Sequence, residues 1–511
     1  MRAQRHLLLP TLRAVQRRVG WIGREALDEV CRRLSVPPAE AYGVASFYAL
    51  LALEPRPARV THVCTDLACR LAGAPEPDGA ESIASNCLGL CDHAPAALLT
   101  VAGPEPEERP LSLGGALGPA RVFGERRLTR RVGVVDPTSL DSYREQGGFE
   151  TLDRARTLGA EAVIELVTEA GLLGRGGAAF PTGRKWAAAA AERGPRYLVC
   201  NADESEPGTF KDRVLMEEDP FAVVESVALA AFACGCERAY LYVRGEYPLA
   251  HERLTAAIEV TGALTGVELE LRIGAGAYIC GEETALFESL EGRRGEPRNK
   301  PPFPTQAGLF GRPTVVNNVE TLLNALDIVR DGPEAWRAAE TRLFCLSGNV
   351  ERPGVYEVRV GTPLPEVLEL AGAEPPQAVL LGGAAGSFLR PDELDVELSF
   401  EGARAAGATL GSGAVIVFGP DADLAGAVLR IAEFFRDESC GQCVPCRVGT
   451  VRQEEALHRL AAQTPLGSRG QELTLLKEVG QAMTDASICG LGQTASAAVL
   501  SALDKGLVWS S

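Results

Sequence analysis

The chain has 511 residues, of which 46% are hydrophobic and 23% are charged. This composition can fill several buried cores and excludes a wholly disordered chain. The 68 acidic residues outnumber the 51 basic ones and give a formal net charge of −17, which argues against a nucleic-acid-binding surface. No apolar run reaches the roughly 18 residues that cross a bilayer, so direct membrane insertion is not expected.

The N-terminal stretch MRAQRHLLLPTLRAVQRRVG is cationic, but its apolar run is short and no small-residue cleavage site follows it. We interpret it as the amphipathic first helix of a cytoplasmic protein. Apolar positions at helical spacing, here and in residues 24–36, predict helices up to about residue 60.

The next segment predicts a strand that runs into a cysteine turn at residues 59–70, followed by a loop rich in Pro, Gly and Glu at 72–81. Residues 85–101 predict a turn and a second strand. Residues 103–131 are weakly patterned, and we interpret them as a linker.

From about residue 155 the pattern alternates between helices and strands, which predicts an α/β sheet with crossover helices. The predicted elements are helices at 160–173, 221–235 and 249–264 and strands at 196–203, 238–247 and 267–275. Short strands and turns between 341 and about 420 predict a small β-rich domain with one helix. The tail from residue 424 onward predicts helices.

Cys440, Cys443 and Cys446 lie at two-residue spacings in one loop of this tail. Thiolates are the natural ligands of iron–sulfur clusters, and three in one loop can hold three corners of a cubane. The fourth ligand is then Cys489, the only other cysteine of the tail. Tetrahedral zinc is the alternative, but structural zinc sites usually combine two C-x-x-C pairs, so this spacing favours [4Fe–4S].

A second group joins Cys64 and Cys69 with Cys87 and Cys91, four thiols within 28 residues. Two pairs suit a [2Fe–2S] cluster with two ligands on each iron, whereas zinc pairs are more often separated by two residues. A disulfide framework is not expected without a secretion signal, and the five histidines do not cluster into a metal site. We interpret the remaining cysteines as buried core residues: Cys31, Cys200, Cys234, Cys236, Cys280 and Cys345.

Residues 171–186, GLLGRGGAAFPTGRKW, form a glycine-rich segment between two predicted helices. Glycine allows backbone N–H groups to approach a phosphate, and Arg175, Arg184 and Lys185 add positive charge. The segment is not the G-x-G-x-x-G dinucleotide fingerprint, so a structural glycine turn is the alternative.

Three further polar segments lie in the same predicted α/β domain, and amides and carboxylates there suit the edges of a flavin and ribose hydroxyls. One of them directly follows a predicted strand, where α/β sheets bind ligands. Together the four segments favour a nucleotide or flavin site over four unrelated solvated turns. The polar residues are Asn201, Asp203, Glu204 and Glu206, then Glu282 and Glu283, then Asn317 and Asn318.

Several motifs mark a family resemblance: CDHAPA, DSYREQGGFETLDR, PTGRKW, EPGTFKDR, GAGAYICGEE, KPPFP and DASICGLGQ. From about 155 to 511 the chain resembles the NADH-binding flavoprotein subunit of respiratory NADH:quinone oxidoreductase. From 1 to about 100 it resembles the smaller [2Fe–2S] subunit of that enzyme. The fusion is most similar to the diaphorase (beta) subunits of NAD-dependent formate dehydrogenases.

The resemblance implies a multidomain fold of mixed α+β and α/β class. N-terminal helices would be followed by a shortened thioredoxin-like [2Fe–2S] domain, because only 17 residues separate Cys69 from Cys87. A Rossmann-like α/β domain, a β-grasp (soluble-ligand-binding) domain and a helical [4Fe–4S] bundle would complete it. The expected bounds are 1–60 for the helices, 61–132 for the thioredoxin-like domain with its linker, 133–338 for the FMN/NAD domain, 339–422 for the β-grasp domain and 423–511 for the bundle.

The resemblance also implies FMN, NAD and two iron–sulfur clusters. FMN would contact Gly174, Gly176, Lys185, Asn201, Asp203, Gly281, Glu282, Asn317 and Asn318. NAD would stack on the flavin and contact Phe180, Glu206, Glu283, Lys300 and Phe303. Arg175, Gly177, Gly183 and Tyr278 complete the predicted cofactor-binding set, in which Glu206 and Glu283 are the predicted catalytic residues. The predicted metal ligands are Cys64, Cys69, Cys87, Cys91, Cys440, Cys443, Cys446 and Cys489.

NAD exchanges two electrons as hydride, whereas an iron–sulfur cluster carries one, so FMN has to lie between them. The resemblance therefore implies the NAD-reducing subunit of a cytoplasmic formate dehydrogenase, whose molybdenum- or tungsten-containing partner supplies the electrons. The alternatives are the diaphorase subunit of an NAD-reducing hydrogenase and a subunit of a respiratory complex, which usually keeps these parts as separate chains. A redox-sensing scaffold without activity is a further alternative, against which the flavin and NAD motifs argue.

Overall fold

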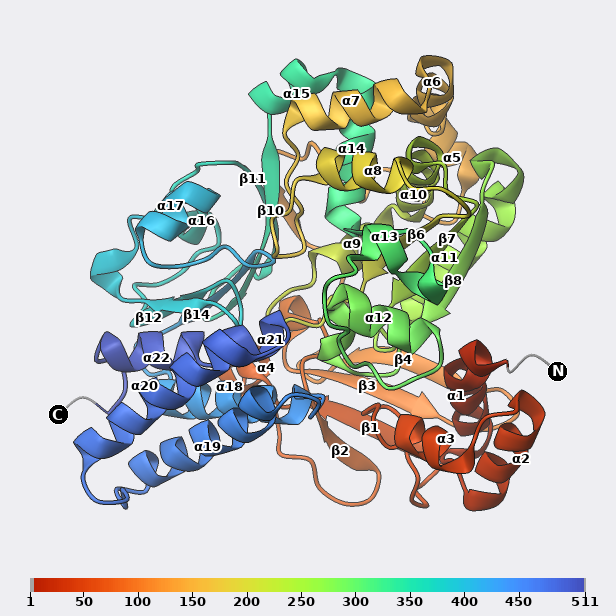
Figure 1. Ribbon diagram of the computed structural model, residues 1–511. Coiled ribbons are helices and arrows are strands. Elements are labelled where there is room, and N and C mark those ends of the chain that lie inside the picture. The colour runs from red at the N-terminus through yellow and green to blue at the C-terminus, as the bar shows by residue number, and fades with distance from the viewer. Residues whose placement is uncertain (1–3, 510–511) are drawn as a thin grey trace.

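Three β-sheets and a C-terminal helical bundle form the computed structural model, which describes residues 4–509 (Figure 1). The N-terminal and C-terminal helices lie on opposite sides of the lower half of the view, and the parallel sheet with its helices occupies the upper half. Within residues 4–509, none of the helices combines the length and the apolar character that crossing a membrane requires.

The predicted N-terminal helices are present, and α1 buries Leu8, Leu9 and Leu12 on one face. Their buried residues belong to one hydrophobic cluster with Ile279 and Phe287 of the α/β part, so these helices pack on the rest of the molecule. The elements are η1 (Arg5–Leu7), α1 (Leu8–Val19), α2 (Arg24–Leu34) and α3 (Pro38–Ala45).

The first sheet has the order β2-β1-β3-β4 and contains the thioredoxin-like part. β1 and β2 are parallel and are connected through the short helix α4, whereas β1 and β3, and β3 and β4, are antiparallel. Its elements are β1 (Arg59–Cys64), α4 (Leu67–Leu71), β2 (Ser82–Ser85), η2 (Cys91–His93), β3 (Ala96–Val101) and β4 (Glu107–Ser112).

The segment interpreted as a linker, residues 103–131, forms two strands instead. It supplies β4 to the first sheet and then β5 (Val122–Gly124), which pairs with β11 of another sheet. Local pattern misses both strands because one contains Pro110 among charged residues and the other is only three residues long. Their pairing with distant strands stabilises them.

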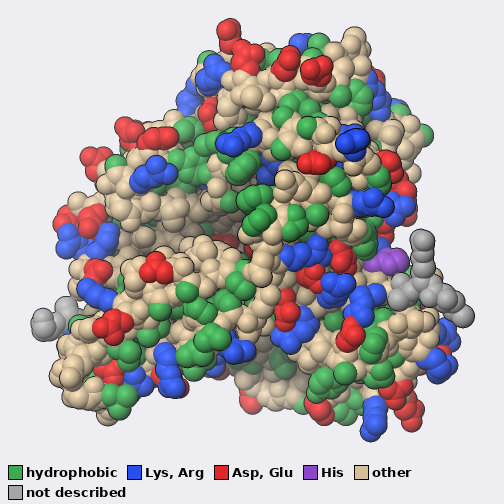
Figure 2. Space-filling view, in the orientation of Figure 1, with side chains coloured by type: hydrophobic (Ala, Val, Ile, Leu, Met, Phe, Trp, Pro, Cys, Tyr) green, Lys and Arg blue, Asp and Glu red, His purple; other side chains and the backbone are tan. Residues whose placement is uncertain are grey.

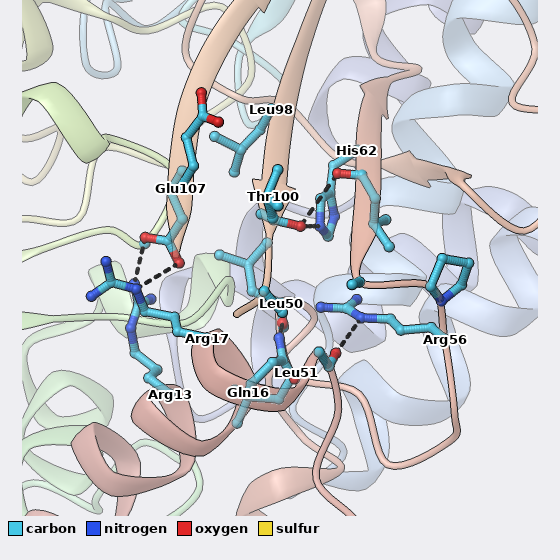
Figure 3. Close-up of a pocket in the computed structure, with 18 residues that line it drawn as sticks. Arg13, Gln16, Arg17, Leu50, Leu51, Arg56, His62, Leu98, Thr100 and Glu107 are labelled. Carbon is cyan, nitrogen blue, oxygen red and sulfur yellow. Dashed lines mark hydrogen bonds and ion pairs between the residues drawn. The ribbon is translucent and has the colours of Figure 1, made fainter. Parts of the chain in front are cut away.

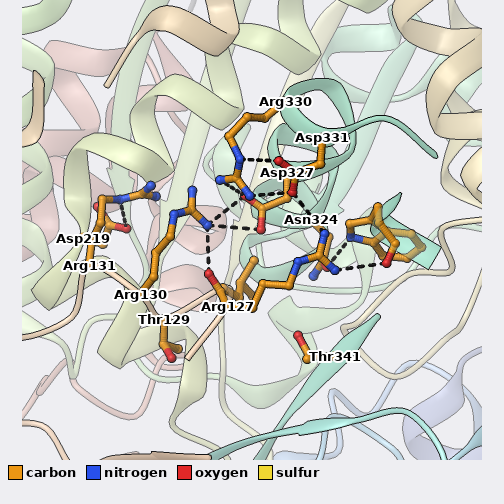
Figure 4. A network of polar contacts seen from close by, with 12 residues as sticks. Arg127, Thr129, Arg130, Arg131, Asp219, Asn324, Asp327, Arg330, Asp331 and Thr341 are labelled. Carbon is orange, nitrogen blue, oxygen red and sulfur yellow. Dashed lines mark hydrogen bonds and ion pairs between the residues drawn. The ribbon is translucent and has the colours of Figure 1, made fainter. Parts of the chain in front are cut away.

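Polar contacts hold the end of this segment against the α/β part (Figure 4). Arg131 donates from Nε to Asp219 at 2.7 Å, and Arg130 contacts Asp327 at 3.0 Å. Nearby, the fully buried carboxylate of Glu357 accepts from the backbone N–H and the hydroxyl of Thr129 at 3.0 and 2.7 Å. A buried charge is tolerated only with such partners.

The parallel sheet has the order β8-β7-β6-β9, as the alternating pattern predicts. The chain progresses from β6 outward to β8 and then returns to the other side of β6. This reversal creates a crevice at the carboxyl ends of β6 and β9, the place where such sheets bind ligands. The strands are β6 (Tyr197–Ala202), β7 (Arg238–Val243), β8 (Glu268–Ile273) and β9 (Thr314–Asn318).

Helices cover this sheet, and α10 is buried along almost its whole length because its sequence is apolar on every face. The helices are α5 (Leu140–Glu145), α6 (Glu150–Leu158), α7 (Ala160–Ala170), α8 (Thr182–Ala190), α9 (Lys211–Glu218), α10 (Pro220–Cys234), α11 (Pro248–Thr265), η3 (Tyr278–Gly281), α12 (Glu283–Leu290), α13 (Pro304–Ala307), η4 (Leu309–Gly311), α14 (Val319–Asp331) and α15 (Pro333–Ala338).

The β-rich part is a mixed sheet of order β13-β12-β14-β10-β11-β5. It carries two short helices rather than the single one predicted; the pattern misses α17 because it has six residues and an internal Gly402, although Ser399 caps it. The elements are β10 (Thr341–Gly348), β11 (Gly354–Arg359), α16 (Leu364–Leu370), β12 (Ala378–Leu381), β13 (Ser387–Leu389), η5 (Pro391–Glu393), α17 (Phe400–Ala405) and β14 (Ala414–Phe418).

The C-terminal tail forms the predicted helical bundle, and its apolar faces belong to the same cluster as the N-terminal helices. The loop between α18 and α19 carries Cys440 and Cys443, Cys446 lies in the first turn of α19, and Cys489 directly precedes α21. The helices are α18 (Leu424–Glu438), α19 (Val444–Ala461), α20 (Arg469–Ala486), α21 (Gly490–Thr494) and α22 (Ala497–Asp504).

Candidate cofactor site

The glycine-rich segment lies against the end of β9. A Cβ atom on Gly176 would lie 3.1 Å from Cβ of Asn318, so only glycine allows this close approach without displacement. Asn318 donates from Nδ2 to Asp212. Its buried Oδ1 has no hydrogen-bond partner within the described residues, an acceptor that a bound ligand would satisfy.

Two other predicted segments meet at the end of β6. Asn201 donates from Nδ2 to the carbonyl of Gly281 at 2.9 Å and accepts from the backbone N–H of Asp203 at 3.1 Å. Asp203 in turn accepts from the hydroxyl of Ser205 at 3.1 Å. Burial raises the pKa of Asp203 to about 8, so this carboxyl group can donate a proton in a hydrogen bond near neutral pH.

Two lysines and two glutamates form an ion-pair group beside these segments. Lys300 lies 2.8 Å from Glu283 and 3.0 Å from Glu282, and Lys185 lies 3.7 Å from Glu283. Burial opposes ionisation of Glu283, but Lys185 and Lys300 lower its pKa, so it is held as a carboxylate. Glu282 also caps α12 through the backbone N–H of Thr284 at 2.8 Å.

Two predicted NAD-contacting aromatics are exposed. Phe180 is 46% exposed and Phe303 is 55% exposed, although aromatic side chains are normally largely buried. The ammonium of Lys185 lies 5.6 Å from the centroid of the Phe180 ring. Exposed rings beside positive charge suit stacking of a planar, anionic nucleotide.

Glu206 connects this region to the β-rich part. It accepts from the hydroxyl of Tyr278 and from the backbone N–H of Ala385 at 2.9 Å. Burial raises its pKa to about 7. A Cβ atom on Gly383 would lie 2.7 Å from the Glu206 side chain, so the loop at 383–385 closes directly on it. Sequence reasoning missed this loop, whose only signal is the glycine-rich run after β12.

Three predicted cofactor-binding residues have protein partners of their own. The guanidinium of Arg175 pairs with Glu340, and Asn317 accepts from the indole N–H of Trp186 at 2.8 Å. A Cβ atom on Gly183 would lie 2.2 Å from the hydroxyl oxygen of Thr168, which explains this glycine by the packing of α8 on α7. The charge of Arg175 is therefore not directed to a phosphate.

Cys64, Cys69, Cys87 and Cys91 are all buried and converge in the first sheet despite the short intervening segment. The sulfurs of Cys87 and Cys91 lie 3.5 Å apart, and contacts with Cys69 and Cys87 raise the pKa of Cys64. The backbone N–H of Ala96 donates to the sulfur of Cys69 at 3.4 Å. The four thiols thus form one cluster-sized group.

The other four predicted ligands line one hollow of about 260 Å³ next to the bundle. Cys440, Cys443 and Cys446 come from the loop and first turn before and within α19, and Cys489 precedes α21. The hydroxyl of Ser439 lies 3.3 Å from the sulfur of Cys446. The remote fourth cysteine is therefore brought to the other three.

The visible face of the molecule is hollowed between the part with β12 and β14 and the part with α12 (Figure 2). Acidic and basic side chains are interspersed over this face rather than gathered into a field of one sign.

A separate small pocket, open to solvent, lies between α1, the loop after α3 and the first sheet (Figure 3). Glu108 lies 3.6 Å from both Arg13 and Arg17 there, and Arg56 donates to the carbonyl of Gly20 at 2.8 Å. None of the predicted cofactor or metal residues is among the described residues that line it.

Four family matches follow the order of the parts. Residues 1–78 match the thioredoxin-like [2Fe–2S] ferredoxin family, and residues 167–327 match the Nuo51 FMN-binding domain. Residues 343–384 match the SLBB domain, and residues 426–505 match the NADH-ubiquinone oxidoreductase-F iron–sulfur binding region. The predicted fold class is confirmed.

The chain is 42% identical to the NADH-quinone oxidoreductase-F protein of Aquifex aeolicus over 409 residues, which cover 75% of this chain and 94% of that protein. The chain belongs to the NADH-quinone oxidoreductase-F family. Within this family it carries an additional N-terminal thioredoxin-like [2Fe–2S] part. It is an NADH-binding, FMN- and iron–sulfur-containing oxidoreductase subunit, and the cofactors predicted from the sequence are confirmed at this level.

Three proteins whose names refer to hydrogenases match most of the chain. It is 34% identical to the NAD-reducing hydrogenase HoxS subunit alpha of Cupriavidus necator, covering 99% of this chain and 91% of that one. The crystal structure of an air-oxidised NAD⁺-reducing [NiFe]-hydrogenase superposes with a TM-score of 0.87 at 33% identity and covers 100% of this chain and 94% of the other. The NADP-reducing hydrogenase subunit HndC of Solidesulfovibrio fructosivorans is 40% identical over 74% of this chain.

The observed residues fit the family's cofactors. The open acceptor on Asn318 and the close approach of Gly176 leave backbone and amide groups available to FMN. Both cysteine groups offer four thiols each, the number that a [2Fe–2S] or a [4Fe–4S] cluster requires.

Proposed function

We propose that the chain is the diaphorase subunit of a cytoplasmic NAD-reducing hydrogenase. The observation that carries the proposal is coverage: the HoxS subunit alpha aligns with 99% of this chain, including the fused N-terminal part, whereas the Aquifex protein aligns with 75%. The superposition on an NAD⁺-reducing hydrogenase over the full chain supports the same assignment.

The structure supports a division of tasks among the site residues. Asn201, Asp203 and Asn318 with the glycine-rich segment would hold FMN at the switch point of the parallel sheet. Glu206 and Glu283 would orient NAD on the flavin, and exposed Phe180 and Phe303 would stack against it. Bound FMN supplies the exchange between hydride and single electrons. The chain itself contributes orientation and electrostatics and needs no nucleophile.

The eight cysteines would ligate the two clusters, with Cys64, Cys69, Cys87 and Cys91 on [2Fe–2S] and Cys440, Cys443, Cys446 and Cys489 on [4Fe–4S]. With these ligands, the two clusters would pass electrons between a partner subunit and the flavin segments. A scaffold without activity would not need the exposed aromatics and the open acceptor on Asn318.

The formate dehydrogenase assignment implied by the motifs gains no support from the relatives reported above, whose names refer to hydrogenases and NADH-quinone oxidoreductase. We therefore rank the hydrogenase partner first. The quinone oxidoreductase alternative belongs to the same family, but the Aquifex alignment leaves about a quarter of this chain uncovered.

Co-production with each class of partner tests the proposal. The isolated chain should oxidise NADH with ferricyanide but should reduce NAD⁺ with neither hydrogen nor formate. With a nickel–iron hydrogenase module it should gain hydrogen-dependent NAD⁺ reduction. Formate-dependent reduction with a molybdenum or tungsten subunit, and none with hydrogen, would return the assignment to formate dehydrogenase. Failure of the NADH–ferricyanide reaction in flavin-loaded protein would overturn the diaphorase function itself.

A further inference from the structure

The loop at residues 87–92, which we name the second cysteine loop, is held by two arginines of the α/β part. Arg244 donates from Nη2 to the carbonyl of Cys87 at 2.6 Å, and Arg213 donates from Nε to the carbonyl of Gly89 at 2.9 Å. Arg213 also binds both oxygens of Asp92, at 2.7 and 2.8 Å. The loop is thus fixed to the flavin-binding part at three successive points.

Arg244 contacts the flavin side as well. From Nη1 it donates to the carbonyl of Glu204 at 2.7 Å, and Glu204 lies between two residues proposed for FMN and NAD, Asp203 and Glu206. One guanidinium group therefore bridges the carbonyl of a proposed cluster ligand and the backbone of the proposed flavin segment. Its side chain is only 4% exposed, so water does not substitute for these contacts.

The second cysteine loop also packs closely against Tyr247 of the α/β part. Gly89 has φ +65°, and a Cβ atom there would lie 2.1 Å from the hydroxyl of Tyr247. Tyr247 itself donates to the carbonyl of Glu204 at 3.2 Å, and Arg244 stacks 5.1 Å from the centroid of its ring. The packing holds the loop and the flavin segment in one arrangement.

The two arginines differ in the number of carboxylates that neutralise them. Arg213 is neutralised by Asp92 and by Glu217, which lies 3.0 Å away. Among residues 4–509, Arg244 has one carboxylate partner, Glu246 at 3.0 Å, and Glu246 is only 8% exposed. Loss of the Arg244 cation would leave Glu246 as an uncompensated negative charge in a buried region beside the cysteine loop.

An iron–sulfur cluster gains negative charge on reduction, so a nearby buried cation stabilises its reduced form, and net charge is one determinant of cluster potential. We propose that Arg244 is a positioning residue that docks the second cysteine loop on the flavin segment and raises the reduction potential of the N-terminal [2Fe–2S] cluster. The inference rests on the proposed function and on the proposed ligands Cys64, Cys69, Cys87 and Cys91.

The test is a potentiometric titration of the full chain with reconstituted clusters, followed by EPR in the presence of a low-potential reductant. In Arg244→Gln the reduced-to-oxidised ratio of the [2Fe–2S] cluster at a fixed potential should fall about tenfold, which is a shift of about 59 mV for one electron. Arg244→Lys, which keeps the charge, should recover most of this shift. The [4Fe–4S] signal should titrate as in the unmodified chain in every variant.

Arg238→Gln is the matched control, because Arg238 begins β7, the strand that Arg244 directly follows, and is 37% exposed. An unshifted [2Fe–2S] potential in Arg244→Gln overturns the proposal, as does an equal shift in Arg238→Gln. If Arg244→Gln loses the cluster, the titration of Arg244→Lys decides: a potential close to that of the unmodified chain supports the proposal, and a full tenfold fall in the reduced-to-oxidised ratio despite the retained charge overturns it. Absence of a [2Fe–2S] signal in the unmodified chain would instead refute the ligand assignment.

Discussion

Replacing Glu206 with Ala removes the carboxylate that joins the proposed NAD site to the loop at 383–385. A hydrogen bond to a charged group contributes about 1.5–3 kcal/mol, so kcat/KM for NADH should fall by about 10- to 100-fold. FMN should remain bound, because its proposed contacts lie on other residues. Steady-state NADH–ferricyanide kinetics with flavin quantification measure both effects.

The exposed Glu237, which shares no contact with the site, provides the control as Glu237→Ala. It should show unchanged kinetics and flavin content. Loss of flavin from Glu206→Ala would assign this residue to FMN rather than to NAD.

Glu206 also predicts a pH dependence of stability. Burial raises its pKa from 4.5 to about 7 in the folded state. Between these values the folded chain binds more protons than the unfolded chain, so stability is lost as the pH rises through this window. Glu206→Gln cannot ionise, so its melting temperature should fall less than that of the unmodified chain between about pH 5 and about pH 8. Parallel curves for the two proteins would show that Glu206 does not titrate in this range.

At the scale of elements, Asp219 at the start of α10 anchors the segment that leads from β5 to the α/β part (Figure 4). The side chains of Arg131 and Asp219 are 7% and 1% exposed, so Asp219→Ala leaves a buried guanidinium without its carboxylate. We expect a loss of about 3–5 kcal/mol in the free energy of unfolding. Denaturant unfolding of the cofactor-loaded chain measures it.

Asp331 offers a matched comparison in the same network. Its pair with Arg330 is about one-third exposed on both sides, so Asp331→Ala should cost at most about 1 kcal/mol. Equal losses from the two variants would mean that burial does not determine the strength of these pairs.

The sequence predicts those elements whose pattern is local and long. The helix α10 and the strand β6 follow from their mostly apolar runs, and the parallel sheet follows from the alternation of helices and strands. The strands β4 and β5 could not be predicted in this way, because their own residues favour no strand and their pairing partners lie elsewhere in the chain.

The same distinction applies to the site. Cysteine spacing and glycine-rich segments identify the groups that the fold brings together, including the remote Cys489. The sequence does not show which side chains already have partners within the protein. Arg175 is predicted to contact a phosphate, but in the structure it pairs with Glu340. Arg244 carries no motif of its own, and its importance arises only from contacts with residues such as Cys87, far away in the chain.

Over the whole molecule, Glu438 joins the three cofactor segments. It accepts from the amide of Asn86 at 2.6 Å and from the backbone N–H of Tyr278 at 2.8 Å. Asn86 precedes Cys87, Tyr278 belongs to the proposed flavin and NAD segment, and Glu438 ends α18 just before Cys440. The parts that follow one another in the chain therefore meet at one junction, as a relay of electrons between cofactors requires.

Iron content tests whether the chain holds two clusters. The reconstituted chain should contain about six irons and give two distinct EPR signals, from one [2Fe–2S] and one [4Fe–4S] cluster. Cys91→Ser should lose about two irons and one signal, whereas Cys236→Ser, outside both groups, should lose none. About four irons with one signal in the unmodified chain would exclude the N-terminal cluster.

The direction of electron flow across the molecule gives the last prediction. If electrons enter through the C-terminal cluster, Cys489→Ser should abolish hydrogen-dependent NAD⁺ reduction by the assembly with its hydrogenase partner. NADH–ferricyanide activity should largely survive, because ferricyanide can take electrons from FMN without that cluster. Both assays are run on one preparation, and its flavin content shows whether the protein is intact. Together they distinguish a loss of electron transfer from a loss of folding. Equal loss of both activities would mean that the cluster chiefly supports the fold, and retention of both would mean that electrons enter by another route.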